Sequence, residues 1–426
     1  MDSGRGWSRR RVIGAGAGVG LFHIVPASAQ GKDGRPAPSN RITMAAIGTG
    51  GMGNGNLGSF LGQPEVQMLA VCDVDRTRGG KAKETVDKRY GTSDCKAYVD
   101  FRDVIARGDV DAFVQSLPDH WHAMVGIEAS RAGIDTYGEK PFAHSVVDGR
   151  ALVEAVERYG RIWQTGSWQR SRREFRTAAE LVRNGRLGKV VKIEIGLPGG
   201  IACKPVTFGD PPPELDYDLW CGPGPLVPYC RERVHYNWRF QLSFGGGKLM
   251  DWVPHHGDIA HWAMDWDNSG PVEVWGQGDY PTAGIYDAPT RYHVYCRYAN
   301  GTEMHVSNEN KGGVKFIGAN GQWIHANRGS LLASPESLLR DLPGPHEIKL
   351  YYSDNHQRNF LECIKTRQQT ITPAETAHRS ASIGHLGNIA MRLGRKLRWK
   401  PDTEEFVDDP SANALLGRAL RPPWHL

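Results

Sequence analysis

Several features that would mark a particular class of protein are scarce in this sequence. Its seven cysteines are scattered and form no CxxC pair, which argues against both a zinc ribbon and a disulfide framework. Cys221 and Cys230 lie close enough in sequence to pair, but we expect them to stay free. The net charge of +5 is small over 426 residues, and no basic block with interleaved aromatic residues suggests a nucleic-acid partner.

The chain is long enough for two domains with separate cores. Hydrophobic residues make up 39% of it and charged residues 23%, which are ordinary values for a globular protein. Thirteen tryptophans are a high number. Tryptophan is common in cores, but its flat face also packs against the C–H surfaces of sugars. The excess is therefore a weak indication of a carbohydrate ligand.

The first 29 residues have the features of an export signal. Residues 8–13 resemble a twin-arginine motif, a short apolar region rich in glycine and alanine follows, and residues 27–29 form an A-x-A cleavage site. The apolar region is too short to span a membrane, so we expect no stable membrane anchor. Residues 30–40 form a polar linker. The sequence thus predicts export by the twin-arginine machinery to the periplasm or beyond the cell.

Residues 41–73 carry the clearest functional motif. An apolar run ends at Ile47 and is followed by Gly48-x-Gly50-x-x-Gly53, a helical stretch and a second apolar run that stops at Asp73. In a dinucleotide-binding unit the first glycine makes a tight turn, the second admits the pyrophosphate, and the third lets the helix pack against the strand. The helix N-terminus then favours the phosphates. The segment therefore predicts a nucleotide cofactor.

The acid at position 73 bears on the choice between the two nicotinamide cofactors. A carboxylate at the end of the second strand accepts both ribose hydroxyls and repels a 2′-phosphate, so Asp73 favours NAD over NADP. Arg76 and Arg78 follow closely and could soften that preference. Because free NAD is scarce outside the cytoplasm, we expect an exported protein to hold its cofactor tightly and to recycle it.

Strands and helices alternate from residue 41 to residue 168, which predicts a Rossmann domain with a doubly wound parallel sheet. Ligands bind such sheets at the carboxyl ends of the strands. The residues that we expect beside the cofactor are Gly48, Gly50, Gly51, Met52, Gly53, Asp73, Ser116, Pro118, His122, Glu139, Lys140 and Gln169.

The pattern changes in residues 169–397. A proline-rich excursion over residues 205–229 and a helix that begins near Leu249 precede five alternating runs between residues 272 and 326. These runs are spaced like the strands of an antiparallel sheet. We therefore expect an α+β second domain. Residues 398–426 read as an irregular tail over the surface.

Two groups of residues could carry chemistry, and the first is Glu139-Lys140-Pro141 at the end of a strand. Lys140 there would lie beside the nicotinamide. Partial desolvation and the positive ring disfavour the ammonium form, so the lysine can exchange a proton with a substrate hydroxyl. The alternative is a solvated surface lysine beside a glutamate, but the position at a strand end favours function.

The second group is Asp251 and His255, which are four residues apart and so share one face of a helix. A carboxylate and an imidazole there can meet one pair of substrate hydroxyls, and His255 can exchange a proton near neutral pH. A core histidine bonded to the aspartate is one alternative. A metal site that includes Asp258 and His261 is another, but the spacing matches no diagnostic metal motif, and we expect no metal.

With these motifs the chain resembles the Gfo/Idh/MocA family of oxidoreductases from about residue 41 to its end. The matching segments are residues 48–53, 139–141 and 245–247, together with the pair Asp251 and His255. Residues 219–223, 237–240 and 374–380 are similar to an exported branch of that family. The resemblance implies an NAD(P)-binding domain and a second domain whose large open sheet often forms oligomer interfaces. It also implies hydride transfer to or from sugars, cyclitols and related polyols.

By the same resemblance Lys140 is the catalytic lysine, and Asp251 and His255 face the substrate. In the mechanism that we expect, Lys140, assisted by His255, takes the proton of a sugar hydroxyl while the hydride passes to NAD⁺. Asp251 orients His255. Val253 stands near a position where family members often carry glycine, so His256 is an alternative substrate contact. Further candidates for the pocket wall are Trp168, Gln169, Arg170, Trp238 and Arg239.

Three functions stay open on these grounds. The first is an NAD(P)-dependent oxidoreductase that acts on the hydroxyl of a sugar, glycoside or polyol, including paired oxidation and reduction of two sugars. The second is an NAD-dependent glycoside hydrolase or lyase that works through transient oxidation and elimination, with the cofactor recycled in place. The third is an NAD-bound sugar sensor, against which a lysine at the nicotinamide end argues.

Overall fold

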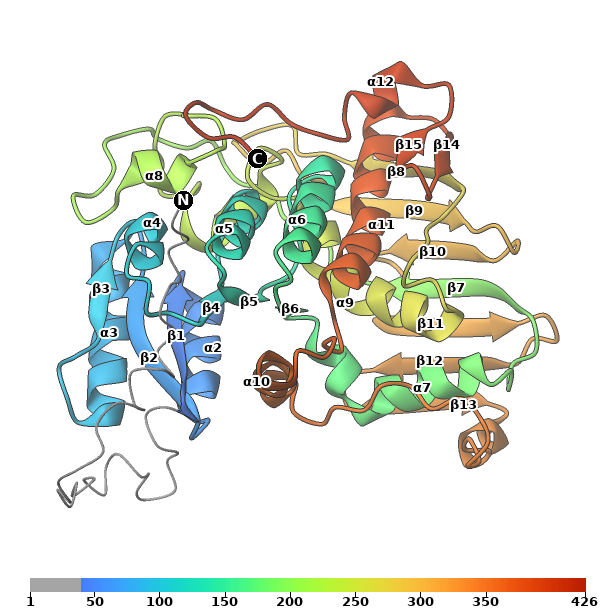
Figure 1. The fold of residues 1–426 in the computed structure, drawn as a ribbon. Helices are drawn as coiled ribbons and strands as arrows, with labels where there is room; N and C mark the ends of the chain where they lie inside the picture. The colour runs from blue at the N-terminus through green and yellow to red at the C-terminus, as the bar shows by residue number, and fades with distance from the viewer. Residues whose placement is uncertain (1–39) are drawn as a thin grey trace, which may run out of the picture. The chain divides into compact units, whose positions relative to one another are not determined.

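Two β-sheets organise the chain, as Figure 1 shows. The computed structural model describes residues 40–426. The predicted export signal and residues 30–39 of the predicted linker lie outside these described residues. Within them, no helix combines the length and the apolar character that crossing a membrane would require. The seven cysteines all lie in the described part of the chain, and all are free, as expected.

The first sheet has six parallel strands in the order β3-β2-β1-β4-β5-β6, which confirms the predicted doubly wound topology. The strands are β1 (Ile42–Ile47), β2 (Val66–Cys72), β3 (Lys96–Tyr98), β4 (Ala112–Gln115), β5 (Asp135–Gly138) and β6 (Trp163–Thr165). The helices that connect them are α2 (Gly51–Leu61), α3 (Arg76–Tyr90), α4 (Phe101–Ile105), α5 (Asp119–Arg131) and α6 (Val146–Arg158). The strand order reverses between β1 and β4, and ligands bind at such a point.

The second sheet has nine strands in the order β13-β12-β11-β7-β10-β9-β8-β14-β15. It is mainly antiparallel, as predicted, and β10 with β7 is a parallel pair. Its strands are β7 (Val190–Gly196), β8 (Glu273–Asp279), β9 (Arg291–Arg297), β10 (Glu303–Ser307), β11 (Gly313–Gly318), β12 (Trp323–Asn327), β13 (Ser330–Ser334), β14 (Leu397–Lys400) and β15 (Glu405–Phe406). The five runs expected between residues 272 and 326 are β8 to β12.

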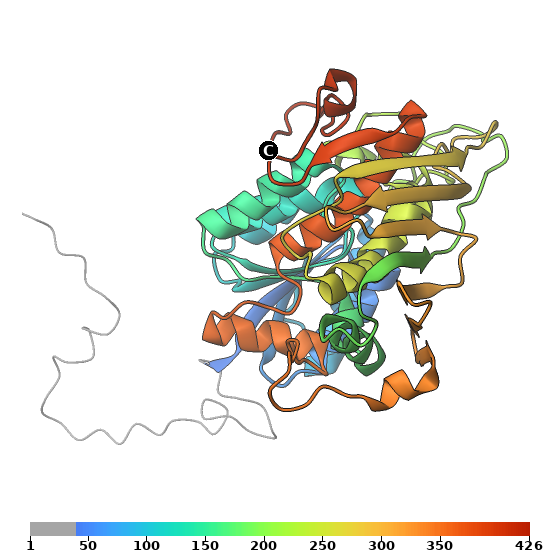
Figure 2. The ribbon, with the colours of Figure 1, turned by 90° about the vertical axis from the view of Figure 1, so that its right-hand side faces the viewer.

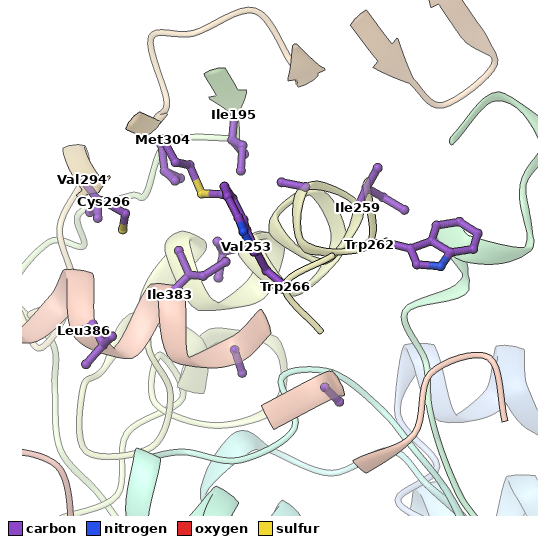
Figure 3. Packing of buried hydrophobic residues seen from close by; sticks show 14 of the residues in the cluster. Ile195, Val253, Ile259, Trp262, Trp266, Val294, Cys296, Met304, Ile383 and Leu386 are labelled. Carbon is purple, nitrogen blue, oxygen red and sulfur yellow. The ribbon is translucent and has the colours of Figure 1, made fainter. Parts of the chain in front are cut away.

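Three helices cover one face of this sheet (Figure 2): α7 (Arg173–Arg183), α9 (Gly247–Met264) and α11 (Ala374–Leu393). Figure 3 shows how side chains of α9 and α11 pack against those of β7, β9 and β10. Along β9 the residues Tyr292, Val294 and Cys296 are buried, and those between them are exposed or half-buried. This alternation is what one buried sheet face requires.

The tail is more ordered than the sequence suggested. Residues 398–426 contribute to β14, supply β15 and α12 (Pro410–Asn413), and then return to the first sheet. There Arg421 donates to the carbonyl of Gly222 at 2.9 Å and pairs with Asp218 at 2.6 Å, and Trp424 packs on Trp121. The prediction of an irregular surface tail therefore missed β14, β15 and α12, and these two strands complete the edge of the second sheet.

The two halves of the chain also interleave. Helix α10 (His356–Thr366) follows the second sheet in sequence but packs on the first, where Phe360 contacts Phe60 and Tyr137. The remaining elements are the short helix α8 (Tyr217–Cys221) and the 3₁₀ turns η3 (Trp168–Ser171), η4 (His235–Phe240) and η5 (Glu336–Arg340). A boundary at residue 168 thus separates the sheets but not the helices that cover them.

Candidate active site

The glycine-rich turn after β1 has the geometry of a phosphate cradle. Gly48 has a φ of +85°, and a Cβ there would lie 2.4 Å from the carbonyl oxygen of Ser116. A Cβ on Gly53 would lie 2.1 Å from the carbonyl oxygen of Gly48. Gly50 caps α2 without a side-chain hydrogen bond, and the first turn holds no acidic residue. The first N–H groups of α2, which have no partner within the helix, are therefore available to an anion.

Asp73 directly follows β2 and is fixed beside this turn. Its Oδ2 accepts from the N–H of Thr49 at 2.8 Å and from the Thr49 hydroxyl at 2.9 Å, and its Oδ1 accepts from the N–H of Asp75 at 3.0 Å. Each carboxylate oxygen has further acceptor capacity. The turn, the helix N-terminus and this carboxylate together fit the pyrophosphate and ribose of a nicotinamide dinucleotide.

A cavity of about 670 Å³ runs from the glycine turn to helix α9. Fifteen residues singled out from the sequence line it: Gly48, Gly50, Gly51, Met52, Gly53, Asp73, Ser116, Pro118, Glu139, Lys140, Trp168, Trp238, Arg239, Asp251 and His255. The first sheet supplies the cofactor end, and α9 with its neighbours supplies the other end. The structure thus brings together in one space the groups on which the predicted chemistry depends.

Lys140 lies where the two ends meet. Its Nζ donates to Oδ1 of Asp251 at 2.7 Å and to the backbone carbonyl of the same residue at 2.9 Å. Lys248 reaches Oδ2 at 2.8 Å, and Nε of Arg239 lies 3.7 Å from it. Burial alone would raise the pKa of Asp251, but the charges of Lys140, Arg239 and Lys248 outweigh it and hold that pKa well below its usual value.

His255 is buried in the wall of the same cavity, and neither of its ring nitrogens bonds to a described residue. Burial, reinforced by the charges of Lys140 and Arg328, holds its pKa well below the usual histidine value. The imidazole is therefore neutral at neutral pH. The expectation that Asp251 orients His255 is wrong, because Lys140 and Lys248 already occupy the carboxylate.

Glu139 lies between Lys140 and the cofactor turn. Asn56 donates to its Oε1 at 3.0 Å, and a Cβ on Gly166 would lie 2.6 Å from that oxygen. Burial raises the pKa of Glu139, while the charge of Lys140 and the bond from Asn56 act in the opposite direction. Its side chain is thus held in place at the floor of the cavity.

Four residues expected to contact ligands do not line the cavity. The ring nitrogens of His122 face the backbone carbonyls of Pro141 and Leu117, and the nitrogen that carries the proton donates to one of them. Arg170 is buried and pairs with Asp258 at 2.8 Å and with Asp267 at 2.7 Å. His256 and Gln169 lie behind the wall, where the Gln169 amide faces the His256 ring. His122 and Arg170 therefore stabilise the fold instead of contacting a ligand, because each uses its buried polar atoms on partners within the protein.

The residues considered as metal ligands point to other partners. Asp251 is held by lysines, Asp258 by Arg170, and Nε2 of His261 lies 2.7 Å from the hydroxyl of Tyr298. Among the described residues, no group of three or more histidine, cysteine, aspartate or glutamate side chains could hold a metal ion.

Several cavity residues were not anticipated. Lys248 is three residues before Asp251 on α9, and that spacing could have revealed it. Arg328, in the turn between β12 and β13, and Trp252 of α9 gave no signal in the sequence. The other unanticipated residues discussed below are Leu215, Trp220, His235 and Tyr236.

A segment that we term the strap, residues 212–240, crosses the cofactor end. The N–H of Asp216 donates to the carbonyl of Val74 at 2.9 Å. The N–H of Arg76 donates to the carbonyl of Glu214, also at 2.9 Å. The proline-rich excursion of the sequence is therefore tied to the loop that follows Asp73. The strap residues that line the cavity are Leu215, Leu219, Trp220, His235, Tyr236, Trp238 and Arg239.

A Rossmann sheet with a dinucleotide turn, facing a lysine, an aspartate and a neutral histidine, defines a nicotinamide-dependent oxidoreductase. The chain matches the profile "Oxidoreductase family, NAD-binding Rossmann fold" over residues 42–167 and "Oxidoreductase family, C-terminal alpha/beta domain" over residues 173–426. It belongs to the Gfo/Idh/MocA family. It is accordingly an NAD(P)-dependent oxidoreductase.

Three curated relatives show the range of this similarity. An uncharacterized oxidoreductase, YrbE of Bacillus subtilis, is 25% identical over 84% of this chain and 96% of its own length. The myo-inositol 2-dehydrogenase of Thermotoga maritima is 23% identical over 83% of this chain and 94% of its own length. A glycosyl hydrolase family 109 protein of Stenotrophomonas maltophilia is 25% identical over 50% of this chain and 47% of its own length.

Two solved structures share the fold. The WlbA dehydrogenase of Bordetella pertussis, in complex with NADH and UDP-GlcNAcA, superposes with a TM-score of 0.62 at 15% identity, covering 84% of this chain and 99% of that one. The aldose-aldose oxidoreductase of Caulobacter crescentus, complexed with glycerol, superposes with a TM-score of 0.61 at 19% identity, again covering 84% of this chain and 99% of that one. At these identities the likeness concerns the fold alone.

Proposed function

We propose that the protein transfers hydride to or from a hydroxyl-bearing carbon of a sugar, glycoside or polyol. The observation that carries this proposal is Lys140: its Nζ contacts Asp251 at 2.7 Å in the same cavity as the glycine turn. Tryptophans and Tyr236 in the wall offer flat surfaces for a sugar ring. The myo-inositol 2-dehydrogenase among the curated relatives supports the same substrate class.

Lys140 and His255 have different roles in the proton transfer because one is a cation and the other is neutral. A bound nicotinamide supplies the hydride acceptor or donor. Lys140 donates in both of its contacts, so it is placed to hold the reacting oxygen, while the neutral imidazole of His255 has a nitrogen available to take the hydroxyl proton. Asp251 fixes the position of Lys140. In the reverse direction the same groups return the proton to the carbonyl oxygen.

A spectroscopic titration tests this function. The protein is mixed with NAD, then with NADH, and a panel of monosaccharides, inositols and glycosides is added while the absorbance of the reduced nicotinamide is followed. We expect at least one compound to raise the band from NAD and its oxidised form to bleach it from NADH. A protein that binds the cofactor but shows no change with any member of the panel contradicts the proposal.

The alternative chemistry is net cleavage of a glycoside. Oxidation of a ring carbon acidifies the neighbouring C–H, and a neutral base such as His255 could take that proton before the aglycone leaves. The partial similarity to glycosyl hydrolase family 109 proteins favours including this reaction in the test. Release of nitrophenol from an aryl glycoside with no net change in the nicotinamide band would identify it.

Within this function we propose NAD rather than NADP as the cofactor. Replacing Asp73 by serine should weaken NAD binding about 10-fold, because a charged acceptor for the ribose hydroxyls is lost, and should improve NADP binding relative to NAD. Titration of both reduced cofactors by fluorescence measures the ratio. Asp94→Ser, in an exposed position after α3, is the matched control. An unchanged ratio in Asp73→Ser would contradict the assignment.

The cellular setting follows as part of the proposal. The twin-arginine sequence supports export in the folded state, and the strap supports tight retention of the cofactor, since Leu215, Trp220 and Tyr236 lie over the cavity that holds the glycine turn. The face of the second sheet that α7, α9 and α11 leave uncovered carries stacked Trp275 and Tyr295. We propose this face as the surface where copies of the chain associate.

A further inference from the structure

The end of the cavity away from the glycine turn carries excess positive charge. Lys140, Lys248 and Arg239 all surround one carboxylate, that of Asp251. Arg328 lines the same space. With Glu139 counted as the second negative group, four cations face two anions. The buried carboxyl of Asp119 interacts with Arg239 and Lys140, but burial raises its pKa to about 8, so this carboxyl is largely protonated at neutral pH.

The oxidised nicotinamide makes this imbalance larger, because its ring also bears a positive charge. Buried or half-buried charges require compensation, and cations clustered in a cleft attract an anion. The phosphates of the cofactor lie at the other end, against the glycine turn. At that end Arg78 has a carboxylate of its own, since it pairs with Asp75 at 3.5 Å. The missing negative charge must therefore come from whatever occupies the substrate end.

Arg328 is held as an anion-binding arginine would be. Its guanidinium packs over two indole rings, 4.5 Å from the centre of Trp168 and 4.6 Å from that of Trp252. When the Gln169 amide is oriented by its hydrogen-bond partners, its nitrogen donates to the His255 carbonyl at 3.0 Å and its oxygen accepts from Nε of Arg328 at 3.1 Å. These neighbours fix the plane of the guanidinium and satisfy Nε.

The terminal nitrogens of Arg328 are left for a ligand. No carboxylate of the described residues pairs with Arg328, and neither Nη atom bonds to a described residue, although most cavity cations have such a partner. A planar guanidinium with both Nη groups available binds carboxylate or phosphate oxygens in a bidentate manner. The position of Gln169, predicted as a cofactor contact, is explained by this support of Arg328.

We infer that the substrate is an acidic carbohydrate, whose oxyanion is bound by Arg328 while its reacting hydroxyl lies at Lys140 and His255. This inference rests on the proposed function and narrows its substrate class. The shared chemistry is an oxyanion on a sugar, either the carboxylate of a uronate or the phosphate of a sugar phosphate. Neutral sugars fit the aromatic wall but leave the excess charge uncompensated.

Paired sugars test the inference. The protein saturated with NAD is titrated by calorimetry with D-glucuronate against D-glucose, D-galacturonate against D-galactose, and D-glucose 6-phosphate as the phosphate arm. At least one acidic sugar should bind 10-fold or more tightly than its neutral partner. Arg328→Gln should weaken acidic binding about 10- to 100-fold and change neutral binding little. Arg328→Lys should restore part of the preference, because the charge returns without the planar fork.

Arg172→Gln is the matched control. Arg172 lies 5.9 Å from the same Trp168 ring, but it pairs with Glu174 at 3.1 Å and does not line the cavity. Its loss should leave the preference unchanged. Equal binding of the acidic and the neutral sugar in every pair would overturn the inference, and so would a preference for the acidic sugar that survives in Arg328→Gln. In either case, a neutral sugar that reacts would leave the proposed function standing. Failure of all sugars to bind and to react would overturn both.

Discussion

Replacing Lys140 by methionine should lower kcat by roughly 10²- to 10³-fold, the usual cost of removing one donor that holds the reacting oxygen in the transition state. Lys140 is the cation that links the carboxyl end of β5 to Asp251, and both of its contacts face the cavity. Binding of the nicotinamide cofactor should change by no more than about threefold, because the glycine turn and Asp73 are untouched. Steady-state kinetics and a fluorescence titration of NADH separate the two effects.

The variant should also fold. Asp251 keeps Lys248 at 2.8 Å and Arg239 at 3.7 Å, so its carboxylate stays paired after the loss of Lys140, and Asn56 still donates to Glu139 at 3.0 Å. Lys192→Met is the control: this lysine is half-exposed on β7 and pairs with Glu194 of the same strand. It should retain full activity. A Lys140→Met enzyme that keeps more than about a tenth of the kcat would remove the residue from the catalytic machinery.

Gly53→Ala should impair both folding and cofactor binding. The added Cβ would lie 2.1 Å from the carbonyl oxygen of Gly48, a contact that requires the helix to move away from the strand. We expect the free energy of unfolding to fall by roughly 1–3 kcal/mol, as for other overpacked sites. NAD binding should weaken with it, because the turn that holds the pyrophosphate is displaced. Denaturant unfolding and NAD titration measure the two losses.

The neighbouring Gly55 provides a control within the same helix. A Cβ there meets no atom within 4 Å, so Gly55→Ala adds only helix propensity. It should stabilise the protein by about 0.5–1 kcal/mol and leave NAD binding unchanged. If the two alanine variants behaved alike, the close approach of α2 to the turn would not explain the third glycine of the motif.

The cofactor end was predictable because its rules are local. Strand, turn, helix and second strand follow one another within residues 42–73, and each glycine has a steric reason that the coordinates confirm at Gly48 and Gly53. The parallel sheet followed from the alternation of elements. Lys140 could be found for the same reason, since the carboxyl ends of parallel strands meet at one edge.

The substrate end was harder to predict because its contacts join distant segments. Helical spacing placed Asp251 and His255 on one face, but it could not show that Lys140 and Lys248 reach the carboxylate first. For the Asp251 carboxylate, ion pairs with the two lysines are more favourable than a hydrogen bond to the neutral imidazole of His255. Arg328 stands in a turn between two strands, where an arginine is ordinarily solvated, and its role becomes visible with Trp168 and Trp252 in place.

The strap and the tail show the same limitation. Nothing in residues 212–240 indicates that they return to the loop after Asp73, since the contact includes backbone hydrogen bonds that any residue but proline can donate, together with packing of Val74 against the strap. The irregular composition of residues 398–426 hid two short strands, which are stable because β14 pairs with β8 and β15 pairs with β14. Sequence periodicity describes an element, and tertiary pairing decides where it lies.

The central claim is that one cavity holds the nicotinamide against Lys140 and His255. A crystal structure of the protein with NAD bound tests it most directly. We expect the pyrophosphate at the N-terminus of α2, the adenosine ribose at Asp73 under the strap, and the nicotinamide ring beside Nζ of Lys140, with room for a sugar between the ring and Arg328. A nicotinamide that lies away from Lys140, or points out of the cavity, would contradict the account.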